Sequence, residues 1–179
     1  MKLKCDVFGG RPTPNVTWLR DGSPIASETF LMPSGRNLRS EIVVERLSRQ
    51  DLNSRFTCKA INHHRATPVE ASVQLDMNFA PLNIRLLGAH QHQPLSAGRR
   101  YDLLCQSSGS RPPAVITWFR DAERLDRTTE TTSSDGNQTT STLSITLSRL
   151  DAGKYLSCKA YNHMSPSDAL EDGWRLDIQ

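Results

Sequence analysis

The sequence contains one pattern twice, with an offset of 100 residues. Cys5, Trp18 and Cys58 return as Cys105, Trp118 and Cys158. Shorter motifs keep the same offset, such as Arg20-Asp21 with Arg120-Asp121 and Lys59-Ala60 with Lys159-Ala160. Self-similarity at a fixed period indicates repeated structural units. The 179 residues therefore predict two like domains, which we place at residues 1–78 and 79–179.

The spacing within each repeat predicts the fold of the two domains. The tryptophan follows the first cysteine by 13 positions, and the second cysteine follows the tryptophan by 40. This order and these gaps are typical of two packed antiparallel sheets, joined by a disulfide that contacts a tryptophan of strand C. Short apolar and polar alternations, such as residues 143–146 and residues 174–178, indicate strands rather than helices. The predicted fold class is all-β, with two tandem immunoglobulin-like β-sandwiches.

The four cysteines are expected to be structural. They allow three pairings, and the repeat selects Cys5 with Cys58 and Cys105 with Cys158. Each bridge would close a loop of 53 residues, which is worth roughly 4 kcal/mol on the chain-entropy estimate. A domain has a net stability of about 5 to 15 kcal/mol, so each bridge is a large share of it. Trp18 and Trp118 are the expected core tryptophans.

The composition excludes some classes of partner. The chain is 36% hydrophobic and 23% charged, with a net charge of +3, and its basic residues are scattered among acidic ones. This balance does not favour nucleic acid. The sequence contains no run of about 20 apolar residues that would form a membrane helix, and its first residues have no apolar core of the secretory kind.

The distances before the first cysteines differ between the two domains. Four residues precede Cys5, whereas about 24 lie between the domain junction and Cys105. The first domain is therefore expected to lack its strand A. We interpret the chain as a fragment of a longer protein, whose leader and membrane anchor would lie outside it.

One departure from the common immunoglobulin pattern indicates a subtype. Many such domains place a tyrosine two residues before the second cysteine, but this chain has Phe56 and Leu156 there. Strand alternation instead points Leu156 to the core and Tyr155 outward. Asp51 and Asp151 stand seven residues before their cysteines. This pattern resembles the constant-like second-domain type of nectins, nephrins and their relatives.

Longer segments indicate a narrower resemblance. The stretch CDVFGGRPTPNVTW, the junction LDMNFAPL and the paired loops GGRPTP and GSRPPA resemble the Sidestep family of arthropod neuronal surface receptors. The resemblance covers essentially the full chain. It implies two interior immunoglobulin domains of a membrane-anchored ectodomain that binds Beaten path family proteins in axon guidance. If that family binds its partners through an amino-terminal domain, these two domains would act as a spacer.

No catalytic or cofactor-binding constellation is present in the sequence. It has no Gly-rich phosphate loop, nucleophile elbow, HExxH motif or CxxC pair, so we expect neither an enzyme nor a cofactor. His63 and His64 follow Cys58, and His90 and His92 could share one side of an extended segment. A zinc site needs three or four ligands, and the disulfides remove the cysteines, so we expect no metal site.

Two sequons predict glycosylation of a secreted chain. The first is Asn15-Val16-Thr17, at the entry to the predicted strand C, and the second is Asn137-Gln138-Thr139, in a polar loop. Alternation points Val16 and Trp18 inward, so Asn15 and Thr17 are expected to face solvent. The polar surroundings of Asn137 predict exposure as well.

The outer face of the sheet formed by strands C, F and G is the candidate partner surface. If Trp118 and Cys158 point inward, then Phe119, Tyr155, Lys159 and Tyr161 point outward, and this mixture of aromatic and cationic residues is enriched at binding hot spots. The corresponding set of the first domain is less aromatic, with Leu19, Thr57, Lys59 and Ile61. The alternative is that these side chains cover the sheet and contact glycans or neighbouring domains.

Three classes of protein make different predictions for this chain. A surface recognition module predicts formed disulfides and glycans, an intracellular structural module of the muscle-filament kind predicts reduced cysteines, and an enzyme predicts a pocket with perturbed titratable groups. The sequons and the Sidestep-like junction favour the first class, on the extracellular side of the plasma membrane. The expected partners are proteins of the immunoglobulin superfamily. The alternatives are a nectin-type or nephrin-type adhesion protein and an intracellular structural immunoglobulin module.

Overall fold

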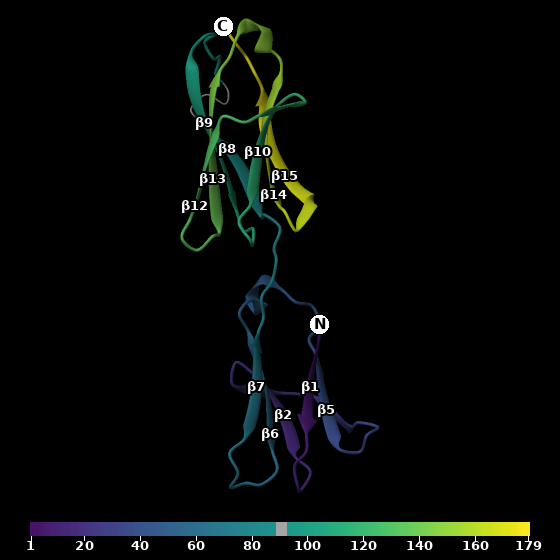
Figure 1. The fold of residues 1–179 in the computed structure, drawn as a ribbon. Coiled ribbons are helices and arrows are strands. Elements are labelled where there is room, and N and C mark those ends of the chain that lie inside the picture. Colours follow the sequence, from purple (N-terminus) through teal and green to yellow (C-terminus); the bar gives the residue numbers. More distant parts are fainter. Residues whose placement is uncertain (89–92) are drawn as a thin grey trace. The chain divides into compact units, whose positions relative to one another are not determined.

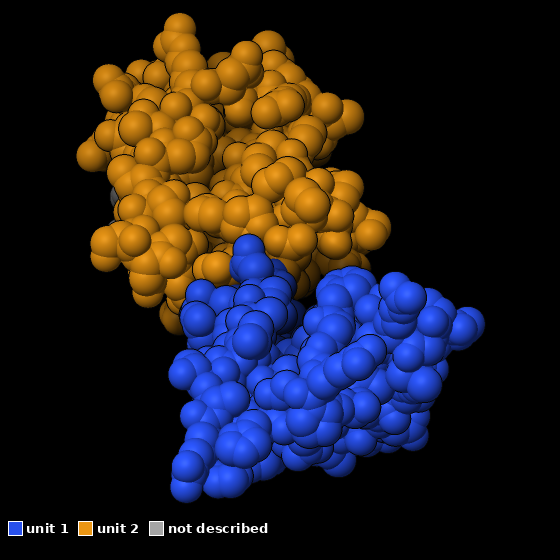
Figure 2. All heavy atoms as spheres, turned by 60° about the horizontal axis from the view of Figure 1, so that its bottom comes forward, with its two compact units in different colours: residues 1–77 blue, residues 78–179 orange. Residues whose placement is uncertain are grey.

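The computed structural model describes residues 1–88 and 93–179 (Figure 1). They form two compact units, Met1–Met77 (unit 1) and Asn78–Gln179 (unit 2), which Figure 2 colours separately. His90 and His92, the histidine pair considered in the sequence, lie outside the described residues. No helix in the described part of the chain has the length and apolar character needed to cross a bilayer.

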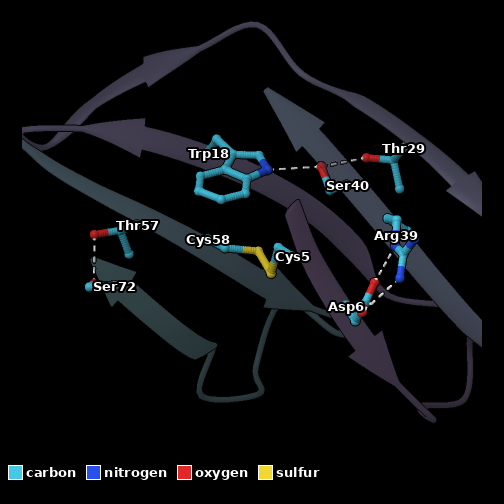
Figure 3. Close-up of a disulfide and its surroundings, with 9 residues drawn as sticks. All are labelled: Cys5, Asp6, Trp18, Thr29, Arg39, Ser40, Thr57, Cys58 and Ser72. Carbon is cyan, nitrogen blue, oxygen red and sulfur yellow. Dashed lines mark hydrogen bonds and ion pairs between the residues drawn. A yellow bond between two sulfur atoms is a disulfide. The ribbon is translucent and has the colours of Figure 1, made fainter. Parts of the chain in front are cut away.

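Unit 1 consists of two antiparallel sheets. Its elements are β1 (Lys2–Phe8), β2 (Asn15–Arg20), β3 (Ser23–Ile25), β4 (Glu28–Leu31), β5 (Asn37–Val43), the 3₁₀ helix η1 (Arg49–Asp51), β6 (Arg55–Ile61) and β7 (Val69–Gln74). One sheet has the strand order β1-β5-β4 and the other β3-β2-β6-β7. The disulfide between Cys5 on β1 and Cys58 on β6 joins the two sheets (Figure 3).

Unit 2 repeats this arrangement with one additional strand. Its elements are β8 (Asn83–Leu87), β9 (Arg100–Ser108), β10 (Val115–Arg120), β11 (Glu123–Leu125), β12 (Thr128–Thr132), β13 (Gln138–Thr146), the 3₁₀ helix η2 (Arg149–Asp151), β14 (Tyr155–Asn162) and β15 (Ser165–Arg175). The sheets are β12-β13-β9-β8 and β11-β10-β14-β15. The prediction of two tandem all-β sandwiches is confirmed. Residues 1–77 contain no counterpart of β8, the strand that the first domain was expected to lack.

Each core is built around a tryptophan that makes one buried hydrogen bond. In unit 2, Trp118 and the Cys105–Cys158 disulfide are 0% exposed, and the Trp118 Nε1 donates to Ser141 Oγ at 2.9 Å. In unit 1, the Trp18 Nε1 donates to Ser40 Oγ at 3.0 Å (Figure 3). Both serines lie directly opposite the first cysteine of their unit, so the tryptophan connects the two sheets beside the disulfide.

Asp51 and Asp151 close the ends of the sandwiches. Each carboxylate accepts a hydrogen bond from the backbone N–H of the serine that precedes the 3₁₀ helix. It also pairs with the arginine that ends β2 or β10, Arg20 or Arg120. Burial raises the pKa of Asp151, but the backbone N–H of Ser148 and the charge of Arg120 outweigh it and hold the pKa below its usual value. These residues therefore stabilise the fold as carboxylates.

The last strand ends earlier than the alternation of Trp174, Leu176 and Ile178 predicts. β15 ends at Arg175, and the following residues change partners. Leu176 bonds to Lys154 and Gly153 through its backbone, while Ile178 forms a parallel bridge with Leu95. Leu176 is nevertheless buried, at 3% exposure, because the chain continues over the core in an extended conformation after leaving the β14–β15 ladder.

Candidate interaction surface

Strands β10, β14 and β15 of unit 2 present the side chains of the candidate surface. Residues directly opposite each other in an antiparallel pair point to the same face of the sheet. The opposing pairs that face away from the core are Val115 with Tyr161, Thr117 with Lys159, Phe119 with Ser157, Lys159 with Glu171, and Tyr155 with Arg175. The four residues proposed from the sequence, Phe119, Tyr155, Lys159 and Tyr161, therefore lie on one face, which we call the outer face of unit 2.

Phe119 and Lys159 form the centre of this face. The Lys159 Nζ lies 5.1 Å from the centroid of the Phe119 ring, within the range of a cation–π interaction, which is worth about 0.5 to 1 kcal/mol at exposed sites. Both side chains are half-buried. This contact places a cation and an aromatic ring side by side at the centre of the face, where hot-spot residues of protein interfaces tend to cluster.

Two small polar residues lie beneath these long side chains. Thr117 and Ser157 belong to the outer face, yet they are 8% and 3% exposed. Each lies directly opposite a long residue on the neighbouring strand, Thr117 opposite Lys159 and Ser157 opposite Phe119. The long side chains therefore cover the short ones, and the layer that a partner would meet consists of rings and a cation.

The rim of the outer face is mainly basic. Arg124 on β11 lies opposite Phe119, and Arg175 on β15 lies opposite Tyr155. Glu171 lies opposite Lys159 and is the acidic member of this group. Sequence reasoning did not identify Arg124, Arg175 or Glu171, since their place on this face depends on strand register. A surface with aromatic centre and basic rim suits a partner surface that carries carboxylates.

The same face of unit 1 is different in character. Its outward residues include Leu19, Thr57, Lys59 and Ile61, all half-buried. Thr57 and Ser72 join β6 and β7 by a hydrogen bond between their hydroxyl groups at 2.8 Å (Figure 3). Unit 1 therefore has a lysine at the matching position without an aromatic neighbour of the Phe119 kind, and it offers matched control positions for unit 2.

The two sequon asparagines occupy different places relative to the outer faces of their units. Asn15 begins β2 and lies opposite Ile61, on the outer face of the four-stranded sheet of unit 1. Asn15 and Thr17 are exposed. Asn137 is exposed in the turn before β13, which belongs to the opposite sheet from the outer face of unit 2. A glycan on Asn15 would thus lie on the outer face of unit 1, next to Ile61. A glycan on Asn137 would leave the outer face of unit 2 open.

The described residues contain no group of three or more His, Cys, Asp or Glu side chains that could hold a metal ion. The rings of His63 and His64 stack with their centroids 4.4 Å apart, and all four cysteines are in disulfides.

Comparison with protein families identifies the class of each unit. Residues 1–76 match the immunoglobulin I-set domain family, and residues 86–168 match the CD80-like C2-set immunoglobulin domain family. The chain therefore consists of two immunoglobulin domains in tandem. The constant-like subtype expected from the sequence agrees with the C2-set match of unit 2, whereas unit 1 matches the I-set.

Several large proteins contain segments similar to this chain. Nephrin of Mus musculus is 24% identical over 182 residues, a match that covers 100% of this chain and 14% of nephrin. Contactin-2 of Rattus norvegicus is 33% identical over 162 residues, covering 89% of this chain and 14% of contactin-2. Hemicentin-1 of Homo sapiens is 31% identical over 127 residues, covering 70% of this chain and 2% of hemicentin-1. The chain thus spans a small part of the length of these relatives.

Solved structures share the fold at lower identity. The structure of Rst D1-D2 is similar with a TM-score of 0.68 and 15% identity, covering 100% of this chain and 92% of that one. The ectodomain of mouse nectin-like molecule 4 is similar with a TM-score of 0.58 and 22% identity, covering 99% of this chain and 58% of that one. These similarities show the tandem immunoglobulin fold.

Proposed function

We propose that this chain is part of a cell-surface ectodomain that recognises other immunoglobulin-superfamily proteins, and that the outer face of unit 2 is its contact surface. The similarity to nephrin, contactin-2 and nectin-like immunoglobulin domains supports a role in cell adhesion. The Sidestep-like junction at residues 75–82 supports the narrower role of axon guidance through Beaten path-like partners. Recognition of this kind involves no chemical turnover, and it places the chain on the extracellular side of the plasma membrane.

The observation that carries the proposal is the contact between Lys159 and Phe119 at the centre of a face with a basic rim. Aromatic residues and arginine are enriched at protein interfaces, because they bury large areas and retain a polar contact. Asn137 is exposed in the turn before β13, a strand of the other sheet, so glycosylation there is compatible with binding at this face. The partner surface is expected to carry carboxylates opposite Lys159, Arg124 and Arg175.

A binding panel with matched variants tests this proposal. The two-domain chain is measured against immunoglobulin-superfamily ectodomains, Beaten path-like proteins among them, by surface plasmon resonance. We expect Phe119→Ala and Lys159→Glu each to weaken binding by at least about tenfold, as truncation of hot-spot residues does. The matched variants Leu19→Ala and Lys59→Glu of unit 1 should bind as the parent chain does.

The salt dependence gives a second readout. Because the rim is basic, the association rate should fall as ionic strength rises, and Lys159→Glu should reduce that dependence. Unchanged binding of both unit 2 variants would contradict a contact surface on this face. Binding by a longer ectodomain, but not by these two domains, would instead identify them as a spacer.

A further inference from the structure

Unit 2 contains a groove between β10 and β12, at one side of the sandwich. The groove has a volume of about 430 Å³ and is lined mainly by residues of β10, β11, β12 and β13. Both of its walls are strand edges that have no neighbouring strand among the described residues. β12 is the outermost strand of its sheet, and residues 115–117 of β10 precede the pairing with β11, which begins at Trp118. The groove therefore opens between the two sheets and reaches the core tryptophan.

A buried hydroxyl group lies in the lining of this groove. Thr139 is 3% exposed, and its Oγ1 forms no hydrogen bond with any described residue. A buried hydroxyl without a partner costs free energy, and native structures satisfy the large majority of such groups. Ile116 and Trp118, which line the same groove, are buried as well. Thr139 thus offers a hydrogen-bonding group to a ligand that enters the groove.

A carboxylate lies close to this hydroxyl group. Glu130 on β12 is exposed, yet its Oε1 accepts a hydrogen bond from the core residue Ser141 at 3.0 Å. Its side chain therefore bends into the groove, which Glu130 also lines. Ser141 and Thr139 are two positions apart on β13 and point to the same face, so the carboxylate and the hydroxyl are about 7 Å apart along the strand.

In unit 1, other residue types occupy both positions. Leu38 corresponds to Thr139, because each lies two positions before the serine that binds the core tryptophan. Leu38 packs against the apolar core of unit 1. Thr29 takes the place of Glu130 and bonds to that serine (Figure 3). The immunoglobulin fold therefore requires neither the buried hydroxyl nor the carboxylate, and the polar groove is a property of unit 2.

The charged residues of the groove leave an excess of carboxylate. Asp126 and Glu130 line it together with one cation, Arg124. Arg124 lies opposite Phe119 and so belongs to the outer face of unit 2. In the described part of the chain, neither Glu130 nor the Thr139 hydroxyl bonds to Arg124. A cationic ligand therefore complements the groove better than an anionic one.

We propose that this groove binds the guanidinium group of an arginine side chain presented by a protein partner. A guanidinium carries five N–H donors in a planar fork. With hydrogen bonds of about 2.9 Å, its nitrogens can reach both Glu130 and Thr139, whereas the ammonium of a lysine is a point donor with a shorter span. Val115 and Leu125 line the groove and suit the apolar stem of the arginine. The site does not depend on the outer face of unit 2 as a contact surface.

The test uses arginine capped at both ends, as N-acetyl-L-arginine N-methylamide, with the lysine and citrulline derivatives as matched ligands. The readout is the indole N–H signal of Trp118 in NMR spectra of the two-domain chain, because Trp118 bonds to the serine that contacts Glu130. We expect a saturable shift with arginine, with a Kd of roughly 1 to 10 mM. Binding should be at least about fivefold weaker for the lysine derivative and tenfold weaker for the neutral citrulline derivative. The Trp18 signal of unit 1 is the internal standard.

The ligand series decides between recognition of a guanidinium and unspecific binding. Equal shifts with lysine or citrulline, or no shift with arginine, would overturn the proposal. A shift of Trp18 equal to that of Trp118 would do the same, because unit 1 carries neither polar group of the site. None of these results depends on a partner for the outer face of unit 2, so they are independent of the recognition role proposed above.

Two substitutions separate ligand binding from support of the fold. Glu130→Gln retains an oxygen that accepts from Ser141 and removes the charge, so it should weaken arginine binding at least about tenfold. Thr139→Val keeps the shape and removes the hydroxyl, so it should weaken arginine binding about threefold and raise the melting temperature of unit 2. Thr131→Val, at an exposed position on β12, should leave arginine binding unchanged. A lower melting temperature for Thr139→Val would show that the hydroxyl is already bonded in the free chain, and would overturn the proposal.

Discussion

The hydrogen bond between Trp118 and Ser141 shows how a single polar residue is accommodated in an immunoglobulin core. Both residues are 0% exposed, and the serine hydroxyl in turn donates to Glu130 Oε1 at 3.0 Å. The indole N–H is thereby satisfied inside the core, where an unpaired donor would cost free energy. In unit 1 the Ser40 hydroxyl oxygen likewise accepts from the Trp18 indole N–H, but it also accepts from the Thr29 hydroxyl group.

Ser141→Ala should lower the free energy of unfolding of unit 2 by about 1 to 3 kcal/mol, because the Trp118 indole N–H would lose its partner in the core. Ser144→Ala, a half-exposed position on the same strand, should change it by less than about 0.5 kcal/mol. Denaturant unfolding followed by tryptophan fluorescence measures both. Equal effects of the two substitutions would contradict the role assigned to Ser141.

The lowered pKa of Asp151 predicts how the stability of unit 2 depends on pH. Its pKa in the folded state lies below the usual value, while the unfolded chain has a pKa of about 3.9. The stabilisation is therefore fully present above pH 4 and is lost as the pH falls through the folded pKa. Asp151→Asn should lower the melting temperature at pH 7 and reduce the further loss on acidification. The exposed variant Asp168→Asn is the control, and an unchanged acid response in Asp151→Asn would contradict this prediction.

Among the elements, β14 and β15 approach each other closely at Gly173. A Cβ at this position would lie 2.8 Å from the Ser157 Cβ and would also collide with the carbonyl oxygen of Leu156. Gly173 lies opposite Ser157, next to the centre of the outer face of unit 2. The glycine therefore allows the two strands to pair beneath Phe119 and Lys159.

Gly173→Ala should force β14 and β15 apart at the centre of their ladder. We expect a lower melting temperature of unit 2 and slower association with any partner that contacts the outer face, because Phe119 and Lys159 lose their common support. Ser167→Ala, at an exposed position on the same strand, should leave both quantities unchanged. Calorimetry and surface plasmon resonance provide the measurements, and an unaltered melting temperature for Gly173→Ala would exclude close strand approach as the reason for this glycine.

The sequence predicts elements better than it predicts the contacts between them. The repeat and its spacings predicted both sandwiches, because a cysteine and tryptophan framework constrains which strands face each other. The short segment before Cys5 predicted that the first domain lacks a strand. Alternation assigned Phe119 and Lys159 to one face, since side chains on a strand point alternately to its two sides. Alternation within a strand could not identify Arg124, Glu171 or Gly173, because their roles depend on the register between strands. The early end of β15 was missed because the alternation continues after the chain leaves the ladder.

At the scale of the whole chain, the two units differ in the size of their buried cores, although their sequences are repeats. Among the described residues, the buried apolar core has 14 members in unit 2 and 5 in unit 1. The difference follows largely from β8, because β8 covers the disulfide in unit 2, whereas the corresponding disulfide in unit 1 borders an open groove of about 370 Å³ between β1 and β7. The two bridges close loops of equal length, 53 residues each, so they differ in access rather than in loop entropy.

The order of reduction should reveal this asymmetry. A reductant attacks a disulfide through a thiolate that must reach one of the sulfur atoms. With Cys5 half-buried and Cys105 at 0% exposure, native-state reduction and alkylation should label Cys5 and Cys58 well before Cys105 and Cys158, as peptide mass spectrometry can show. In denaturant both bridges should react at similar rates. Earlier labelling of Cys105 and Cys158 in the native chain would contradict the greater access to the disulfide of unit 1.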